Sequence, residues 1–131
     1  MKRALRFLYD EDGDIAFVNF KATDVAGHDM DFYKKVEMIE KVDSMFALVI
    51  DKLEKNDLVV AITGDHSTPV TKGDHSGDPV PLIVYAPNVR TDNTISFSER
   101  EAAMGGIGRI RGFDIMPILM DLANRSHKFG A

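Results

Sequence analysis

Apolar residues gather in a few short runs, and the spacing within each run predicts its structure. The runs at residues 15–20, 58–63 and 81–86 are rich in β-branched and aromatic residues, as is typical of strands buried on both faces of a parallel sheet. Across residues 31–55 the apolar positions recur every three or four residues, which predicts one face of a long helix. A second helix is predicted at residues 114–124, with Asp114 as its cap.

The order of these runs predicts the architecture. A strand at 15–20, a helix at 31–55 and a strand at 58–63 form a βαβ unit, which crosses over right-handedly. We therefore expect an α/β fold with a mainly parallel sheet and helices on its faces. A chain of 131 residues with 44% hydrophobic content fits one domain, so residues 1–131 are interpreted as a single α/β domain.

The remaining segments are less regular. Residues 2–9 have the pattern of the tail of a helix, and residues 21–30 are polar and small, which predicts a loop. Residues 88–112 are mixed polar with Gly105, Gly106 and Gly108 in the middle, which predicts a mobile loop or lid.

Composition removes several classes of function. The formal net charge is -5, so nucleic acid is not an expected partner. There is no cysteine, which excludes disulfides, thiolate-held zinc and cysteine nucleophiles. No apolar stretch is long enough for a signal peptide or a membrane span, and a cytoplasmic protein is expected.

Aspartates and histidines stand together in the predicted loops. Asp24 and His28 follow the strand at 15–20, Asp65 and His66 follow the strand at 58–63, and His75 precedes the strand at 81–86. Open α/β sheets build ligand sites at the carboxyl ends of their strands. Mixed carboxylate and imidazole ligands suit zinc, manganese and related ions, and two neighbouring ions are a recurrent solution for phosphoryl chemistry.

Each motif alone is weak support, because an aspartate near a histidine occurs often by chance and a loop histidine is more often solvated than metal-bound. All five residues at the predicted strand ends favour a metal site, and we expect their side chains to converge.

The motifs carry a specific resemblance. Asp-Val-Ala-Gly-His at 24–28, Gly-Asp-His-Ser at 64–67 and His75 followed by Asp-Pro-Val-Pro at 78–81 resemble the three C-terminal metal motifs of cofactor-independent phosphoglycerate mutases, within the alkaline phosphatase superfamily. The archaeal branch is the most similar, and the resemblance extends from about residue 17 to about residue 124. It implies that the chain is the C-terminal part of a longer, glycolytic enzyme with an alkaline phosphatase-like domain.

The resemblance also implies residue roles. Asp24, His28 and His75 would hold one divalent ion, while Asp65 and His66 would contribute to a second. Manganese is the first expectation, with zinc, cobalt and magnesium as alternatives. In the family an aspartate and a nucleophilic serine from nearer the N-terminus complete the second site, and no such segment precedes residues 15–20. We therefore expect the nucleophile outside this chain and no mutase turnover from the chain alone.

Some polar residues fit two interpretations. Four hydroxyl side chains stand near the metal motifs and could replace the nucleophile, but turn residues are the favoured interpretation: Ser67, Thr68, Thr71 and Ser76. Arg109 and Arg111 could contact a substrate phosphate, although solvated charges are the more common explanation.

Other functions and partners follow from the same motifs. A phosphatase, phosphodiesterase, sulfatase or phosphopentomutase of the superfamily would share the metal ligands, and so would a non-catalytic metal-binding piece. Phosphoglycerate is the expected substrate. The macromolecular partner would be the missing N-terminal part of the mutase or a second copy of the chain, because a truncated sheet exposes an edge and apolar surface.

Overall fold

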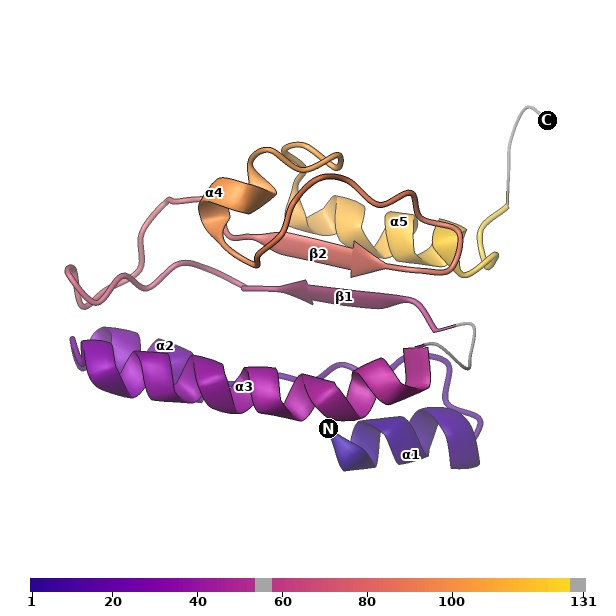
Figure 1. Cartoon of the computed structure of the whole chain (residues 1–131), viewed down its shortest axis with the longest axis horizontal. Coiled ribbons are helices and arrows are strands. Elements are labelled where there is room, and N and C mark those ends of the chain that lie inside the picture. Colours follow the sequence, from indigo (N-terminus) through magenta and orange to yellow (C-terminus); the bar gives the residue numbers. More distant parts are fainter. Residues whose placement is uncertain (54–57, 128–131) are drawn as a thin grey trace. The chain divides into compact units, whose positions relative to one another are not determined.

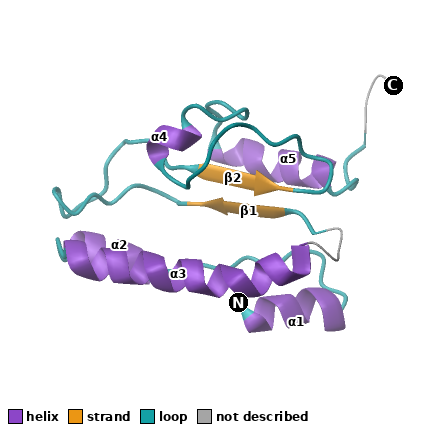
Figure 2. Ribbon diagram, viewed as in Figure 1, coloured by secondary structure: helices purple, strands orange, loops and turns teal. Residues whose placement is uncertain are grey.

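The computed structural model describes residues 1–53 and 58–127. The chain divides into two compact units, and each is described by itself. Unit 1 comprises Met1–Asn56 and Thr68–Ser76, and unit 2 comprises Asp57–Ser67 and Gly77–Ala131. Helices make up most of the regular structure in the described residues (Figure 2).

The described residues of unit 1 form three helices. They are α1 (Lys2–Asp10), α2 (Ala22–His28) and α3 (Phe32–Leu53), and α2 packs against α3 (Figure 1). The Asp31 carboxylate accepts a hydrogen bond of 2.8 Å from the Lys34 N–H, the contact that caps the start of a helix. The predicted helix at 31–55 is therefore confirmed as far as Leu53, and its predicted end lies outside the described residues.

Glu37 stabilises the exposed side of α3 through two lysines. Its carboxylate lies 2.9 Å from Lys34 Nζ and 2.5 Å from Lys41 Nζ, the spacings of neighbours on a helix surface. The hydrogen bonds from Lys41 and then Lys34 lower the pKa of Glu37 to about 2.

Two predictions in unit 1 were wrong. Residues 15–20 form no strand, and Phe17 is 90% exposed. A strand needs a neighbouring backbone to pair with, and none of the described strands pairs with this segment. The predicted loop at 21–30 instead contains α2, so Asp24 and His28 lie on a helix.

Unit 2 contains the only strands among the described residues, β1 (Val60–Thr63) and β2 (Leu82–Tyr85). They are antiparallel, with Val60 opposite Tyr85 and Thr63 opposite Leu82. Both strands were predicted, but the parallel sheet and the βαβ unit were wrong. Parallel neighbours need a long crossover, usually a helix, and the connection from β1 to β2 contains none.

The segment from 88 to 112 is held by side chain contacts to the backbone. Ser98 caps the short helix α4 (Glu99–Ala102) by accepting a hydrogen bond from the Glu101 N–H. The Asp92 carboxylate accepts hydrogen bonds from the Gly106 N–H (2.8 Å) and from the N–H and hydroxyl of Thr94 (3.0 and 2.5 Å). An aspartate thus joins the two sides of the glycine-rich loop.

The end of unit 2 contains a 3₁₀ turn, η1 (Gly112–Asp114), which runs directly into α5 (Ile115–Leu122). Asp114 was predicted to cap the final helix, but its carboxylate makes no capping hydrogen bond to α5. It accepts from the Arg111 N–H at 2.8 Å and therefore closes the 3₁₀ turn instead.

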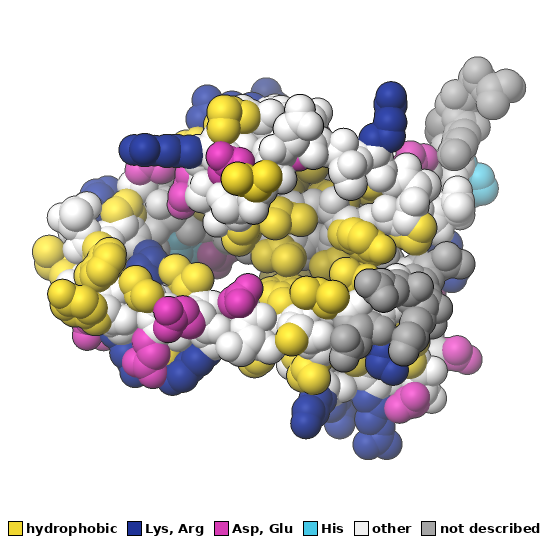
Figure 3. All heavy atoms as spheres, viewed as in Figure 1, with side chains coloured by type: hydrophobic (Ala, Val, Ile, Leu, Met, Phe, Trp, Pro, Cys, Tyr) yellow, Lys and Arg dark blue, Asp and Glu magenta, His cyan; other side chains and the backbone are white. Residues whose placement is uncertain are grey.

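Few apolar side chains are buried. Among the described residues, only Ala26, Val49 and Ala86 form the buried hydrophobic set, and many large apolar side chains lie at the surface (Figure 3). None of the described helices combines the length and the apolar character that a membrane crossing requires.

Candidate metal centre

Asp24 and His28 lie one helical turn apart on α2. Residues four apart on a helix project from the same face, which brings the Asp24 Oδ1 atom to 3.5 Å from His28 Nε2. The Asp-x-x-x-His spacing was itself a helical signal in the sequence, but Gly27 and the small, polar residues around it favoured a loop.

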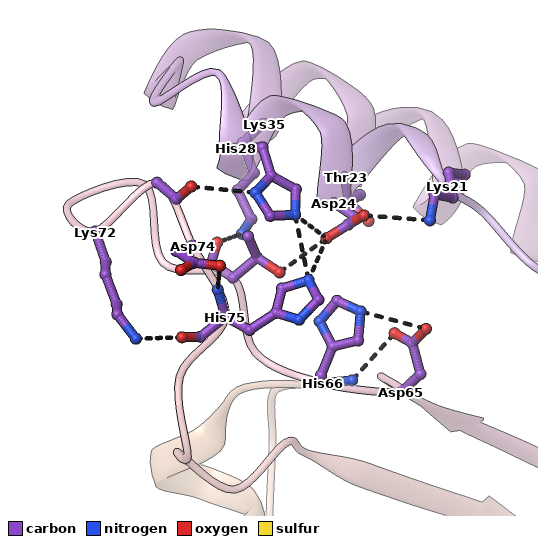
Figure 4. Close-up of polar contacts among 12 residues, drawn as sticks. Lys21, Thr23, Asp24, His28, Lys35, Asp65, His66, Lys72, Asp74 and His75 are labelled. Atoms are coloured by element: carbon purple, nitrogen blue, oxygen red, sulfur yellow. Dashed lines mark hydrogen bonds and ion pairs between the residues drawn. The ribbon is translucent and has the colours of Figure 1, made fainter.

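The loop of unit 1 at residues 68–76 supplies the third side chain. His75 Nε2 lies 3.2 Å from His28 Nε2 and 3.8 Å from Asp24 Oδ1. The two imidazoles and the carboxylate point toward one another (Figure 4). Unit 1 therefore brings together three of the predicted ligands from distant parts of the sequence.

The spacing of these three atoms fits a divalent ion. Two ligands bound at about 2.0–2.1 Å with tetrahedral angles stand about 3.4 Å apart. The distances of 3.2, 3.5 and 3.8 Å bracket this value. Three protein ligands of this kind leave a fourth position open for water or substrate.

The tautomer of His28 also fits metal binding. Its Nδ1 lies 3.1 Å from the Gly73 carbonyl, which accepts a hydrogen bond and thereby places the ring proton on Nδ1. The lone pair of Nε2 then faces Asp24 and His75. Gly73 has φ +68°, a conformation that side chains disfavour, and this turn directs its carbonyl at His28.

Asp24 is held in its ionised form. The Thr68 hydroxyl donates a hydrogen bond of 2.8 Å to Oδ1, and Lys21 Nζ lies 3.5 Å from Oδ2. The Thr68 hydrogen bond is the main cause that lowers the pKa of Asp24, and the nearby His28 and Lys21 side chains add to it. Asp24 is therefore a carboxylate anion that can bind a cation.

Asp65 and His66 lie in unit 2, directly after β1. Asp65 Oδ1 accepts a hydrogen bond of 3.0 Å from the His66 N–H, and Oδ2 lies 3.6 Å from His66 Nε2. Adjacent side chains approach each other in this way only where the backbone is irregular, as it is here. The pair offers one oxygen and one nitrogen ligand within a short distance (Figure 4).

Asp74, which lies beside His75, and the two candidate arginines have different surroundings. Asp74 accepts a hydrogen bond of 2.7 Å from the His75 backbone N–H, which lowers the pKa of Asp74, and the acceptor for the His28 ring is the Gly73 carbonyl. Arg109 and Arg111 are exposed in unit 2, and the Arg111 guanidinium lies 5.6 Å from the centre of the Phe113 ring. Sequence reasoning missed the contact of Thr68 with Asp24, because the two residues are 44 positions apart and no local signal indicates the contact.

A protein-family comparison agrees with this chemistry. Residues 1–122 match the model of the Metalloenzyme superfamily. The chain belongs to the Metalloenzyme superfamily. It is therefore part of a metalloenzyme domain of the alkaline phosphatase-like kind, as the sequence motifs implied.

Curated relatives in this superfamily are similar over nearly the whole chain. The 2,3-bisphosphoglycerate-independent phosphoglycerate mutase of Thermococcus kodakarensis is 56% identical over 92% of this chain and 29% of the relative. That of Pyrococcus horikoshii is 54% identical over 99% of this chain and 31% of the relative. The resemblance to archaeal mutases is confirmed, and the chain spans about 30% of the length of these relatives.

A solved structure has the same fold. The structure of the PH0037 protein from Pyrococcus horikoshii is 54% identical, with a TM-score of 0.92 over 99% of this chain and 39% of that chain. The fold described above is therefore also that of about 39% of the PH0037 chain.

Proposed function

We propose that this chain is the metal-binding part of a 2,3-bisphosphoglycerate-independent phosphoglycerate mutase, which interconverts 2-phosphoglycerate and 3-phosphoglycerate through a phosphoserine. The observation that carries the proposal is the set of Asp24, His28 and His75, whose ligand atoms lie 3.2–3.8 Å apart in a chain 54–56% identical to two archaeal mutases. The test below also separates this activity from the activities of other enzymes of the superfamily.

The residues have separate roles in this proposal. Asp24, His28 and His75 hold one divalent ion, manganese first among the alternatives, and Asp65 and His66 contribute to a second. Bound ions of this kind neutralise charge on a transferring phosphoryl group and favour the ionised form of a hydroxyl nucleophile. The residues of this chain fix the positions of the ligands, since His28 is oriented by Gly73 and Asp24 by Thr68.

The nucleophilic serine comes, in this proposal, from a part of the mutase that this chain does not include. Among the local hydroxyls, Thr68 is only 4% exposed and donates to Asp24, which does not suit an attacking group. Arg109 and Arg111 remain candidates for a contact with the substrate phosphate, and their exposure is compatible with that role.

The macromolecular partner in this proposal is the rest of the mutase. Residues 15–20 are mostly apolar and form neither a helix nor a strand, and Ile15 and Phe17 are 58% and 90% exposed. An apolar segment of this kind gains both backbone pairing and burial when a neighbouring strand is supplied. Self-association of the chain through the same segment is the expected substitute when that strand is missing.

The test is an assay of 2-phosphoglycerate formation from 3-phosphoglycerate with manganese added. The purified chain alone should give no turnover, and mixing it with the separately expressed remainder of an archaeal mutase should give activity. Phosphoryl transfer depends on the complete set of positioned charges, so a partial site should lose many orders of magnitude in rate. Turnover by the chain alone would contradict the proposal, as would hydrolysis of simple phosphate esters without mutase activity on mixing.

A further inference from the structure

Thr68 makes contacts that a simple turn residue does not need. The residue is 4% exposed, and its hydroxyl donates a hydrogen bond of 2.8 Å to Asp24 Oδ1. This is the same oxygen that faces both His28 and His75, at 3.5 and 3.8 Å. Thr68 therefore contacts the carboxylate oxygen that both imidazoles approach.

Two helices fix the position of Thr68. Lys35 on α3 donates a hydrogen bond of 2.6 Å from Nζ to the Thr68 carbonyl. On α2, Gly27 lets the Thr68 backbone come close, because a Cβ at Gly27 would lie 2.5 Å from the Thr68 oxygen and 3.0 Å from its Cγ2. Thr68 is therefore held by the hydrogen bond from Lys35, by close packing against Gly27 and by its burial, and these contacts restrict the position of its hydroxyl.

We infer that Thr68 is a positioning residue for the metal site, which orients Asp24 so that Oδ1 points at the position between His28 and His75. The inference rests on the proposed function for the identity of the ligand set. A hydroxyl suits this role because it can donate to one lone pair of the carboxylate oxygen and leave another for a cation. Outer partners of this kind are known to tune the affinity of the ligands they hold.

Calorimetric titration with Mn²⁺, and separately with Zn²⁺, measures the effect on affinity. Thr68→Val keeps the shape of the side chain and removes the donor, and it should weaken binding of the first equivalent about 10–100-fold. Thr68→Ser keeps the donor and should bind nearly as tightly as the wild type. Equal affinity of Thr68→Val and the wild type would overturn the inference, and so would equal losses in Thr68→Val and Thr68→Ser, which would indicate packing alone.

Lys35→Met tests the same arrangement without touching a buried residue. Methionine keeps the helix propensity of the position, so α3 should persist while the Thr68 carbonyl loses its partner. Binding should weaken several-fold, whereas Lys34→Met, the neighbouring exposed control, should bind as the wild type does. Unchanged affinity in Lys35→Met would count against the positioning role even if Thr68→Val failed to fold.

A readout without metal separates this inference from the proposed function. The Hα–Hβ scalar couplings of Asp24 report whether its side chain occupies one rotamer. We expect one rotamer in the wild type and Thr68→Ser, and averaged couplings in Thr68→Val. If the wild type binds no ion while Thr68→Val still averages these couplings, the metal role fails and the positioning of Asp24 stands. If the wild type binds metal and neither the affinity nor the Asp24 couplings change in Thr68→Val, the metal role stands and the positioning role of Thr68 fails.

Discussion

His28 makes contacts through both of its ring nitrogens. Nδ1 faces the Gly73 carbonyl at 3.1 Å, and Nε2 faces His75 and Asp24 at 3.2 and 3.5 Å. The backbone contact sets the tautomer, so Nε2 is the ring nitrogen whose lone pair is available to a cation. The ring is 40% exposed, which leaves a path for the ion.

His28→Ala should remove the tighter of two metal sites. The variant loses one of three ligands, so affinity for the first equivalent of manganese should fall by at least about 100-fold, more than the loss of an outer partner costs. Calorimetric titration measures this. His127→Ala, a change at an exposed histidine far along the chain, is the control and should bind normally. Two equally tight sites in the wild type would contradict the assignment.

Asp92 gives unit 2 a pH dependence. Hydrogen bonds from the Thr94 hydroxyl and then from the Gly106 N–H lower the pKa of Asp92 from 3.8 to about 2. Because the native pKa is the lower one, the unfolded chain takes up the proton first as the pH falls. The stabilisation by Asp92 is thus present above about pH 4 and is lost toward about pH 2.

Asp92→Ala should therefore lower the midpoint temperature of unfolding at about pH 6 and have little effect on it at about pH 2. Thermal unfolding followed by circular dichroism across this range provides the measurement. Asp43→Ala, which removes an exposed carboxylate from α3, is the matched control. A constant difference between Asp92→Ala and the wild type at all pH values would show that the carboxylate charge is not involved.

At the scale of elements, α2 illustrates how a tertiary contact overrides local preference. A glycine within a helix costs about 1 kcal/mol relative to alanine. Gly27 nevertheless lies in α2, where it is buried against Thr68. The close approach of Thr68, whose hydroxyl donates to Asp24, explains why this position has no side chain.

Gly27→Ala should destabilise the chain even though alanine is the better helix former. The clash with the Thr68 oxygen should cost about 1–3 kcal/mol, as overpacking does, and exceed the gain in propensity. Gly112→Ala is the control, since nothing lies within 4 Å of its added Cβ, and it should change stability by no more than about 0.5 kcal/mol. Urea denaturation of both variants is the measurement. A stabilised Gly27→Ala would contradict the close packing described above.

At the scale of the whole molecule, the apolar surface of residues 15–20 should drive association. Phe17 is 90% exposed. Phe17→Ser should reduce self-association and also reduce complementation by the rest of the mutase, because the apolar area available for burial becomes smaller. Ile95→Ser is a matched control, because Ile95 is 91% exposed but lies in the loop of unit 2. Sedimentation velocity should show reduced self-association for Phe17→Ser and unchanged self-association for Ile95→Ser.

The sequence by itself determined the elements that depend on local periodicity and the chemistry that depends on residue type. The long amphipathic helix α3, the positions of β1 and β2 and the Asp and His motifs follow from spacing and from what each side chain can bind. The similarity to archaeal mutases follows from the same motifs.

Only the tertiary structure decided how these pieces are combined. The sheet is antiparallel and residues 15–20 form no strand, because strand pairing depends on which backbones meet and not on the apolar character of each run. The contact between Thr68 and Asp24 was likewise decided by folding, since it joins residues 44 positions apart through a loop, α2 and α3. The local pattern around Thr68 gives no indication of this pair, and packing selects it.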